Sequence, residues 1–260
     1  MFQDLTLATA LFLLAASFFA GFIDSIAGGG GLIQLPALLI GLPKSETAEV
    51  LGTNKLSSIF GTSTAAALYR KQIKPDPKVL LAMGLPALLG SAGGAMLASK
   101  IPTSSMRPMV LVLLIVVAVY TWFKPDLGKF ENLRHQPKRR VQIAALAGVT
   151  IGFYDGIFGP GTGSFLMLVL VASLGYAFIT ASAIAKVVNV ATNVGAIMVF
   201  GFNGAVIWQV GIIMGIANIS GAILGSRLAI KGGSTLVRKV FLIVTLALIL
   251  KVGIDTFASF

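Results

Sequence analysis

The chain has 260 residues, of which 56% are hydrophobic and 11% are charged, and it carries a net charge of +11 and no cysteine. A soluble domain carries about 25% charged residues, so this composition predicts an all-α integral membrane protein. The lack of cysteine excludes disulfides and thiolate metal sites. The basic residues lie in short connections, as in loops that face the cytoplasm, so the net charge does not indicate a nucleic-acid partner. The single histidine, His135, lies in the most basic loop, so we expect no metal site, and we expect no cofactor.

Apolar segments separated by short polar connections fill the chain. In order they are 5–27, 32–42, 47–69, 79–99, 107–123, 141–158, 164–175, 178–200, 206–230 and 237–257. All but 32–42 and 164–175 are long enough to cross about 30 Å of hydrocarbon. We therefore expect eight full spans plus two short or broken segments. Each short segment follows a glycine-rich break, and non-helical backbone is tolerated at membrane depth only where it is buried in protein or lines a wet cavity.

The sequence matches itself when it is shifted by 131 residues, from Gly21 onto Gly152. The motif GFIDSIAGGG at 21–30 then aligns with GFYDGIFGPG at 152–161, and Lys55 aligns with Lys186. The chain is thus predicted to contain two repeats of about 100 residues that form one transport domain. The first transmembrane repeat is 1–123, a basic linker is 124–140, and the second repeat is 141–260.

The loop charges predict that the two repeats have opposite orientations. The connection 70–78 holds four basic residues, whereas its counterpart 201–209 holds none. The linker 124–140 holds six, whereas the C-terminal tail that corresponds to it holds only Asp255. By the positive-inside rule the linker is cytoplasmic and both termini lie outside the cytoplasm. Inverted repeats with broken helices are typical of secondary transporters.

Four charged residues lie deep in apolar segments and form two equivalent pairs, Asp24 with Asp155 and Lys55 with Lys186. A charge at the bilayer centre costs about 2.5–3.5 kcal/mol on insertion scales, so such residues indicate a functional site. Because the four charges sum to zero, two structural Asp–Lys pairs are an alternative interpretation.

The lysines belong to polar stripes, since Ser58 and Thr62 share a helix face with Lys55, as Asn189 and Asn193 do with Lys186. A half-helix that starts after a glycine break is expected to leave free N–H groups, at residues 29–32 and 162–164, that bind an anion. The predicted substrate-binding residues are Gly28, Gly29, Gly30, Gly31, Asn54, Lys55, Ser58, Thr62, Gly159, Gly161, Thr162, Gly163, Lys186, Asn189 and Asn193. Asp24 and Asp155 are predicted either to couple protons or to hold the lysines.

Two further sets of small residues recur every four positions. They are Gly90, Gly94 and Ala98, and Gly221, Gly225 and Ala229. Such faces let helix backbones approach closely, so we expect helix contacts here, between the repeats or between the copies of a homodimer.

The two copies of G-F-x-D-x-I-x-G-x-G, each followed by a lysine-bearing helix, resemble the TauE/SafE sulfite-exporter family of membrane permeases, from about residue 10 to 255. The resemblance implies transport of sulfite or a small organosulfur anion across the bacterial inner membrane.

We therefore expect a secondary transporter, not an enzyme, that binds a small anion at the midplane between inverted repeats and works by alternating access. An anion channel is an open alternative. An intramembrane aspartyl protease that uses Asp24 and Asp155 is disfavoured, because the GxGD partner motif is missing and both aspartates have near-identical contexts.

Overall fold

A computed structural model describes residues 6–98 and 128–257, and these residues are helical with connecting turns and no strand. The elements are α1 (Leu7–Ala27), α2 (Gly31–Gly41), α3 (Thr47–Gln72), α4 (Pro77–Ala98), α6 (Pro137–Ile157), α7 (Thr162–Leu168), the π-helix η2 (Val169–Ser173), α8 (Phe178–Phe202) and α9 (Trp208–Phe257). The predicted segment 107–123 lies outside the described residues.

One predicted boundary shifts and another is confirmed. α6 begins at Pro137, so residues 137–140 of the predicted linker are helical, since proline suits the first turn of a helix, where its missing N–H is not needed. The predicted segments 206–230 and 237–257 lie in α9 on either side of Gly233, where the backbone leaves the helical conformation (φ 60°, ψ −163°), so the predicted division between them is confirmed.

Four of the described helices are long and apolar enough to cross a membrane: α1, α4, α8 and residues 208–244 of α9. α3 is longer than α1, with 26 residues against 21, but its buried polar residues lower its hydropathy. The outer face of α4 presents Leu81, Leu85 and Leu89, which are 60–69% exposed and suit contact with lipid. The all-helical fold therefore agrees with a membrane protein, while eight spans and two repeats stay predictions.

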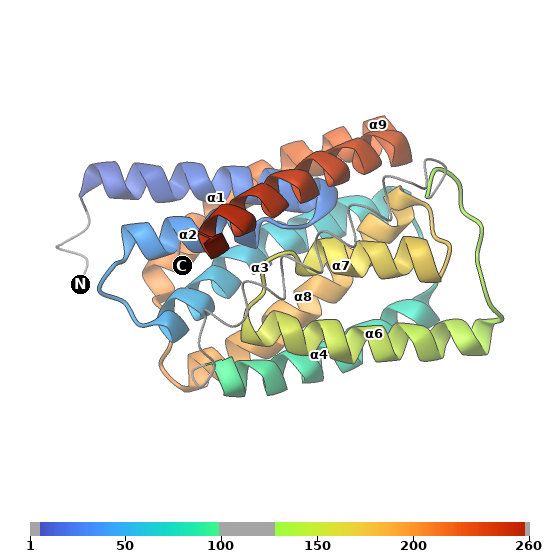
Figure 1. Cartoon of the computed structure of the whole chain (residues 1–260), viewed down its shortest axis with the longest axis horizontal. Helices are drawn as coiled ribbons and strands as arrows, with labels where there is room; N and C mark the ends of the chain where they lie inside the picture. Colours follow the sequence, from blue (N-terminus) through green and yellow to red (C-terminus); the bar gives the residue numbers. More distant parts are fainter. Residues whose placement is uncertain (1–5, 99–127, 258–260) are drawn as a thin grey trace.

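The helices form two close pairs on either side of α3 and α8, with α1 along α9 and α4 along α6 (Figure 1). Glycines make these contacts close. A Cβ at Gly90 or Gly94 of α4 would overlap main-chain carbonyls of α6, and one at Gly221 or Gly225 of α9 would overlap main-chain carbonyls of α1. The prediction that the small residues serve helix packing is confirmed at these four glycines.

α3 and α8 pack against each other and run antiparallel. At one end the hydroxyls of Tyr69 and Ser182 lie 3.2 Å apart, and at the other Gly52 lies against Phe200. Lys55 lies near the Gly52 end of α3, whereas Lys186 lies near the Ser182 end of α8. The antiparallel arrangement therefore brings the two lysines to different levels of the helix pair.

The two glycine breaks contact each other in the middle of the molecule. The first turns through Gly28 and Gly29 (φ 74° and 111°) and the second through Gly159 and Gly161 (φ 90° and 81°), a backbone conformation that favours glycine. The Ser164 hydroxyl, in the second broken segment, donates to the carbonyls of Ala27 and Gly28 at 3.0 and 3.2 Å. A Cβ at Gly28 would overlap the main chain of Gly163, so the breaks meet without intervening side chains.

Candidate functional site

The four deep charges form two ion pairs, each joining a lysine from one predicted repeat to an aspartate from the other. Lys55 Nζ on α3 lies 2.6 Å from Asp155 Oδ1 on α6. Lys186 Nζ on α8 lies 3.0 Å from Asp24 Oδ2 on α1 and also donates to the main-chain carbonyl of Asp24. The side chains of Lys55, Asp155 and Lys186 are at most 3% exposed, and that of Asp24 is 17% exposed. Each buried charge therefore has a partner of opposite sign.

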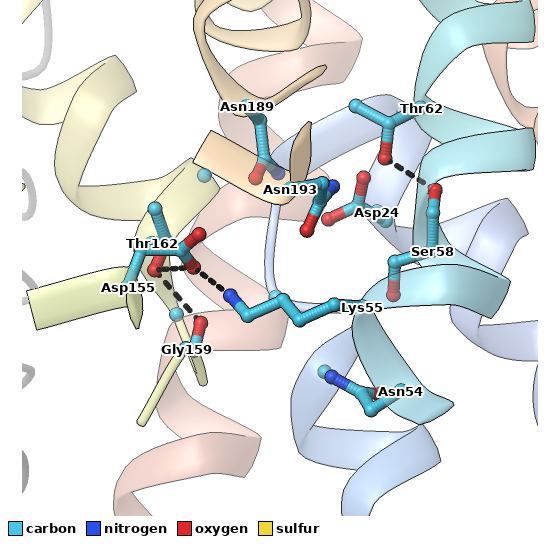
Figure 2. Close-up of a pocket in the computed structure, with 14 residues that line it drawn as sticks. Asp24, Asn54, Lys55, Ser58, Thr62, Asp155, Gly159, Thr162, Asn189 and Asn193 are labelled. Carbon is cyan, nitrogen blue, oxygen red and sulfur yellow. Dashed lines mark hydrogen bonds and ion pairs between the residues drawn. The ribbon is translucent and has the colours of Figure 1, made fainter. Parts of the chain in front are cut away.

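A small cavity of ≈ 20 Å³, room for about one water molecule, lies beside the first pair. Figure 2 shows Lys55 reaching from α3 toward Asp155 at the edge of this cavity. Its 14 lining residues are Asp24, Gly29, Gly31, Asn54, Lys55, Ser58, Thr62, Asp155, Gly159, Gly161, Thr162, Gly163, Asn189 and Asn193. All were predicted site residues, while the predicted Gly28, Gly30 and Lys186 lie outside the lining. The fold thus brings both polar stripes to one cavity, and anion binding there stays a prediction.

Three buried polar atoms of the lining have no hydrogen-bond partner among the described residues: Asn54 Oδ1, Asp155 Oδ2 and Asn193 Nδ2. Two other polar groups of the lining are engaged: the Thr62 hydroxyl donates to the Ser58 carbonyl at 2.7 Å, and Asn189 Oδ1 accepts from Thr192 at 3.1 Å. Unsatisfied buried polar atoms are rare because each costs about 1–3 kcal/mol. Their position around a cavity is typical of a ligand or water site.

The backbone amides of the breaks are less available than predicted. The Leu32 N–H donates to the Gly29 carbonyl at 3.0 Å and the Thr162 N–H to the Gly159 carbonyl at 3.3 Å, because both breaks close as tight turns. The Gly30 N–H donates to Asp24 Oδ1 at 3.4 Å. The prediction of free amides is therefore wrong at these three residues. The amides of the lining glycines at 29, 31 and 163 remain candidate donors.

The carboxylate of Asp155 is further held by the second break. The Thr162 hydroxyl lies 2.6 Å from Asp155 Oδ1 and 2.8 Å from the Gly159 carbonyl. The Tyr154 hydroxyl donates to the Pro160 carbonyl at 2.6 Å and its ring packs edge-on against Phe165. These contacts fix the turn that carries Asp155.

A buried polar network beside Asn54 was not predicted. Asn218 Nδ2 on α9 donates to Gln34 Oε1 on α2 at 2.9 Å and to the Ser17 carbonyl on α1 at 3.0 Å. The Ser17 and Ser57 hydroxyls lie 3.1 Å apart, and Gln34 Nε2 donates to the Asn54 carbonyl at 3.4 Å. The signal in the sequence is that, after the 131-residue shift, the equivalents of this network are apolar. For Ser17, Gln34, Asn54, Ser57 and Asn218 they are Gly148, Phe165, Ala185, Val188 and Ala87.

Within residues 6–98 and 128–257, no group of three or more His, Asp or Glu side chains could hold a metal ion. The chemistry of the cavity is that of a lysine, two carboxylates, amides and hydroxyls.

Residues 13–252 match the protein family described as Sulfite exporter TauE/SafE. The chain is 41% identical over 254 residues to "Probable membrane transporter protein ORF9" from Sinorhizobium sp, covering 97% of this chain and 95% of that protein. It is 36% identical over 262 residues to "Probable membrane transporter protein YfcA" from Escherichia coli K12, covering 98% and 94%. It is 35% identical over 254 residues to a "Probable membrane transporter protein" from Haemophilus influenzae, covering 97% and 98%. No solved structure matches the chain significantly.

Proposed function

Because the chain belongs to the TauE/SafE sulfite exporter family of membrane transporters, we propose that it carries a small anion, of the sulfite or small organosulfur class, by alternating access. The proposed binding site is the cavity between α3, α8 and the two glycine breaks. The location that goes with this proposal is the bacterial inner membrane, with the basic linker in the cytoplasm and both termini outside it.

The observation that carries the proposal is the buried ammonium of Lys55 in a polar cavity where two broken helices meet. A lysine is excluded from an apolar interior unless it has a partner or a function. Lys55 shares the cavity with Asn193, whose amide N–H has no partner among the described residues, and with Ser58 and Thr62 of its own helix. Charge and hydrogen-bond donors in one enclosed place are what an oxyanion requires.

The geometry supports an exchange of ligands at Lys55. An anion that enters the cavity takes the place of the Asp155 carboxylate at Nζ, since both are oxygen acceptors of negative charge. A cavity of ≈ 20 Å³ is too small for an anion of several atoms, so binding requires the helices around it to separate. This favours a carrier that opens to one side at a time over a permanently open channel.

Helix packing supports the two inverted repeats that such a cycle needs. α1 of the first predicted repeat packs along α9 of the second, and α6 of the second packs along α4 of the first (Figure 1). Rocking of the α1–α9 pair against the α4–α6 pair about α3 and α8 would expose the cavity on alternate faces. The protease alternative is further disfavoured, because each aspartate is paired with a lysine rather than sharing a proton with the other.

Two measurements test the proposal. A thermal-shift screen of purified protein against sulfite, sulfate, thiosulfate and sulfonates should give a rise in melting temperature for the transported class, because a ligand that binds only the folded state stabilises it. Flux of that anion into proteoliposomes should fall at least about tenfold in Lys55→Ala, since a charge-assisted hydrogen bond contributes about 1.5–3 kcal/mol. Lys44→Ala, in the exposed α2–α3 loop, is the matched control. Wild-type flux in Lys55→Ala would contradict the proposed site.

A further inference from the structure

The two ion pairs carry equivalent residues but differ in how their carboxylates are bonded. Both oxygens of Asp24 are engaged, Oδ2 with Lys186 Nζ at 3.0 Å and Oδ1 with the Gly30 N–H at 3.4 Å. Lys186 is fully buried, also binds the main-chain carbonyl of Asp24, and lies outside the cavity lining. Lys186 is therefore out of reach of a ligand in the cavity, although its partner Asp24 lines it.

The pair between Lys55 and Asp155 is open to the cavity. Both residues line it, and both donors to the carboxylate, Lys55 and Thr162, converge on Oδ1 at 2.6 Å. Asp155 Oδ2 is buried and has no hydrogen-bond partner among the described residues. A proton can bind this oxygen without displacing a hydrogen bond that the carboxylate already makes, and a buried acceptor without a partner is costly.

We propose that Asp155 is the proton-coupling carboxylate of the transporter and that Asp24 is a positioning residue that ties α1 to α8. This inference rests on the proposed function. When an anion takes Lys55, the Asp155 carboxylate loses its counter-charge. The anion, Asp155 and Lys55 together then carry one positive and two negative charges, while Asp24 stays paired with Lys186. Such an excess is unfavourable in a buried site, and a proton on Asp155 Oδ2 restores neutrality.

The proton balance is simple. One proton comes from water on the side to which the cavity is open, binds Asp155 Oδ2 as the anion binds Lys55, and leaves to water on the opposite side. No other bond forms or breaks except the Lys55–Asp155 ion pair, which reforms after release. A monovalent anion is therefore carried with one proton and without net charge.

The other ionisable groups near Asp155 are already committed. Asp24 from α1 faces the same cavity but is neutralised by Lys186 from α8. The Tyr154 hydroxyl on α6 donates to the Pro160 carbonyl. Lys55 from α3 is the group that the anion takes over. Asp155 is thus the carboxylate whose charge compensation changes during the cycle.

The test is the steady-state accumulation of a monovalent anion, hydrogen sulfite or a monovalent sulfonate that passes the thermal-shift screen, in proteoliposomes with an imposed pH gradient. With one proton per anion, a gradient of one pH unit, acidic outside, is expected to drive about tenfold accumulation in the wild type. Clamping the membrane potential at different values should not change that ratio.

Matched variants separate the two carboxylates. Asp155→Asn is expected to reduce the steady-state ratio of anion inside to anion outside to one, even if the variant transports at a different rate. Asp24→Asn is expected to keep a ratio of about ten. If Asp24→Asn does not fold, the double variant Asp24→Asn with Lys186→Gln, which leaves no unpaired charge, takes its place. If Asp155→Asn does not fold, proton entry on addition of anion to wild-type vesicles, one per anion, supplies the test.

The failures are distinguishable. The assignment of Asp155 as the proton-coupling carboxylate is overturned if the pH gradient still drives accumulation in Asp155→Asn. It is also overturned if accumulation is lost in Asp24→Asn alone. Wild-type flux that ignores the pH gradient, or that follows the membrane potential, overturns proton coupling and leaves the anion site standing. No wild-type flux of any screened anion overturns the proposed function itself.

Discussion

The break after α1 and the break after α6 share the motif G-F-x-D-x-I-x-G-x-G, but their surroundings differ. Behind the first lies the buried hydrogen-bonded network of Ser17, Gln34 and Asn218, and its aspartate uses both oxygens. The second is held by Tyr154 and by aromatic packing, and its aspartate leaves one oxygen unpartnered among the described residues. The comparison teaches that the same motif can hold one carboxylate by both oxygens and the other by one oxygen alone.

The largest loss of folding stability is expected when a lysine of one of the two ion pairs is replaced. Lys186→Met leaves Asp24, which is 17% exposed, without its counter-charge and should lower the free energy of unfolding by about 3–5 kcal/mol, as for other broken ion pairs of low exposure. The double variant Lys186→Met with Asp24→Asn should recover most of this loss, as measured by the melting temperature in detergent. Lys55→Met should cost less, because Lys186 also donates to the main-chain carbonyl of Asp24 in addition to its ion pair. A larger loss in Lys55→Met than in Lys186→Met would reverse the comparison.

The next largest loss of stability is expected when a side chain is added where the two glycine breaks contact each other. Gly28→Ala should destabilise the fold by about 3 kcal/mol or more, because it combines a positive φ with overlap on the main chain of Gly163. At Gly159, also at positive φ, the added Cβ would instead meet the flexible end of Lys55 at 2.8 Å. Gly159→Ala should therefore lose less stability and proportionally more transport. Equal losses of stability in the two variants would show that the breaks do not depend on their close contact.

The network behind the first break gives an intermediate effect. Asn218→Ala leaves Gln34 Oε1 and the Ser17 carbonyl without this donor, so the expected loss is about 1–3 kcal/mol in unfolding free energy. Ser220→Ala, on the exposed face of the same helix, is the control and should change stability by less than about 0.5 kcal/mol. An unchanged melting temperature in Asn218→Ala would show that the network does not stabilise the fold.

The smallest effect is expected at the second break. Tyr154→Phe removes one hydrogen bond, to the Pro160 carbonyl, while keeping the ring contacts, and should cost about 0.5–1.5 kcal/mol. Thr150→Val on the same helix removes a hydroxyl that bonds within its own helix and is the matched control. A loss in Tyr154→Phe as large as that in Asn218→Ala would mean that the two breaks are held equally firmly.

Much of the site could be predicted from the sequence because buried charges and glycine breaks stand out in apolar segments. The 131-residue shift doubled each signal, so the cavity lining contains no residue outside the predicted set. Three features depend on geometry that the sequence does not reveal. Lys186 donates to the main-chain carbonyl of Asp24. The amides of Leu32 and Thr162 donate to carbonyls within tight turns. Each lysine forms its ion pair with the aspartate of the other predicted repeat.

The polar network was missed for a different reason. A single Asn or Gln within an apolar segment usually serves as weak interhelical glue, and neither Gln34 nor Asn218 has a polar partner nearby in sequence. Only the fold brings α1, α2, α3 and α9 together at one point. The apolar equivalents of these residues after the shift were the available clue, since a difference between repeats marks where the halves diverge.

The most direct test of the central claim is equilibrium binding of radiolabelled sulfite to the purified protein. Saturable binding of one anion per chain is expected in the wild type and in the control Lys44→Gln, and its loss is expected in Lys55→Gln. Equal binding in Lys55→Gln and the wild type would contradict an anion site at Lys55.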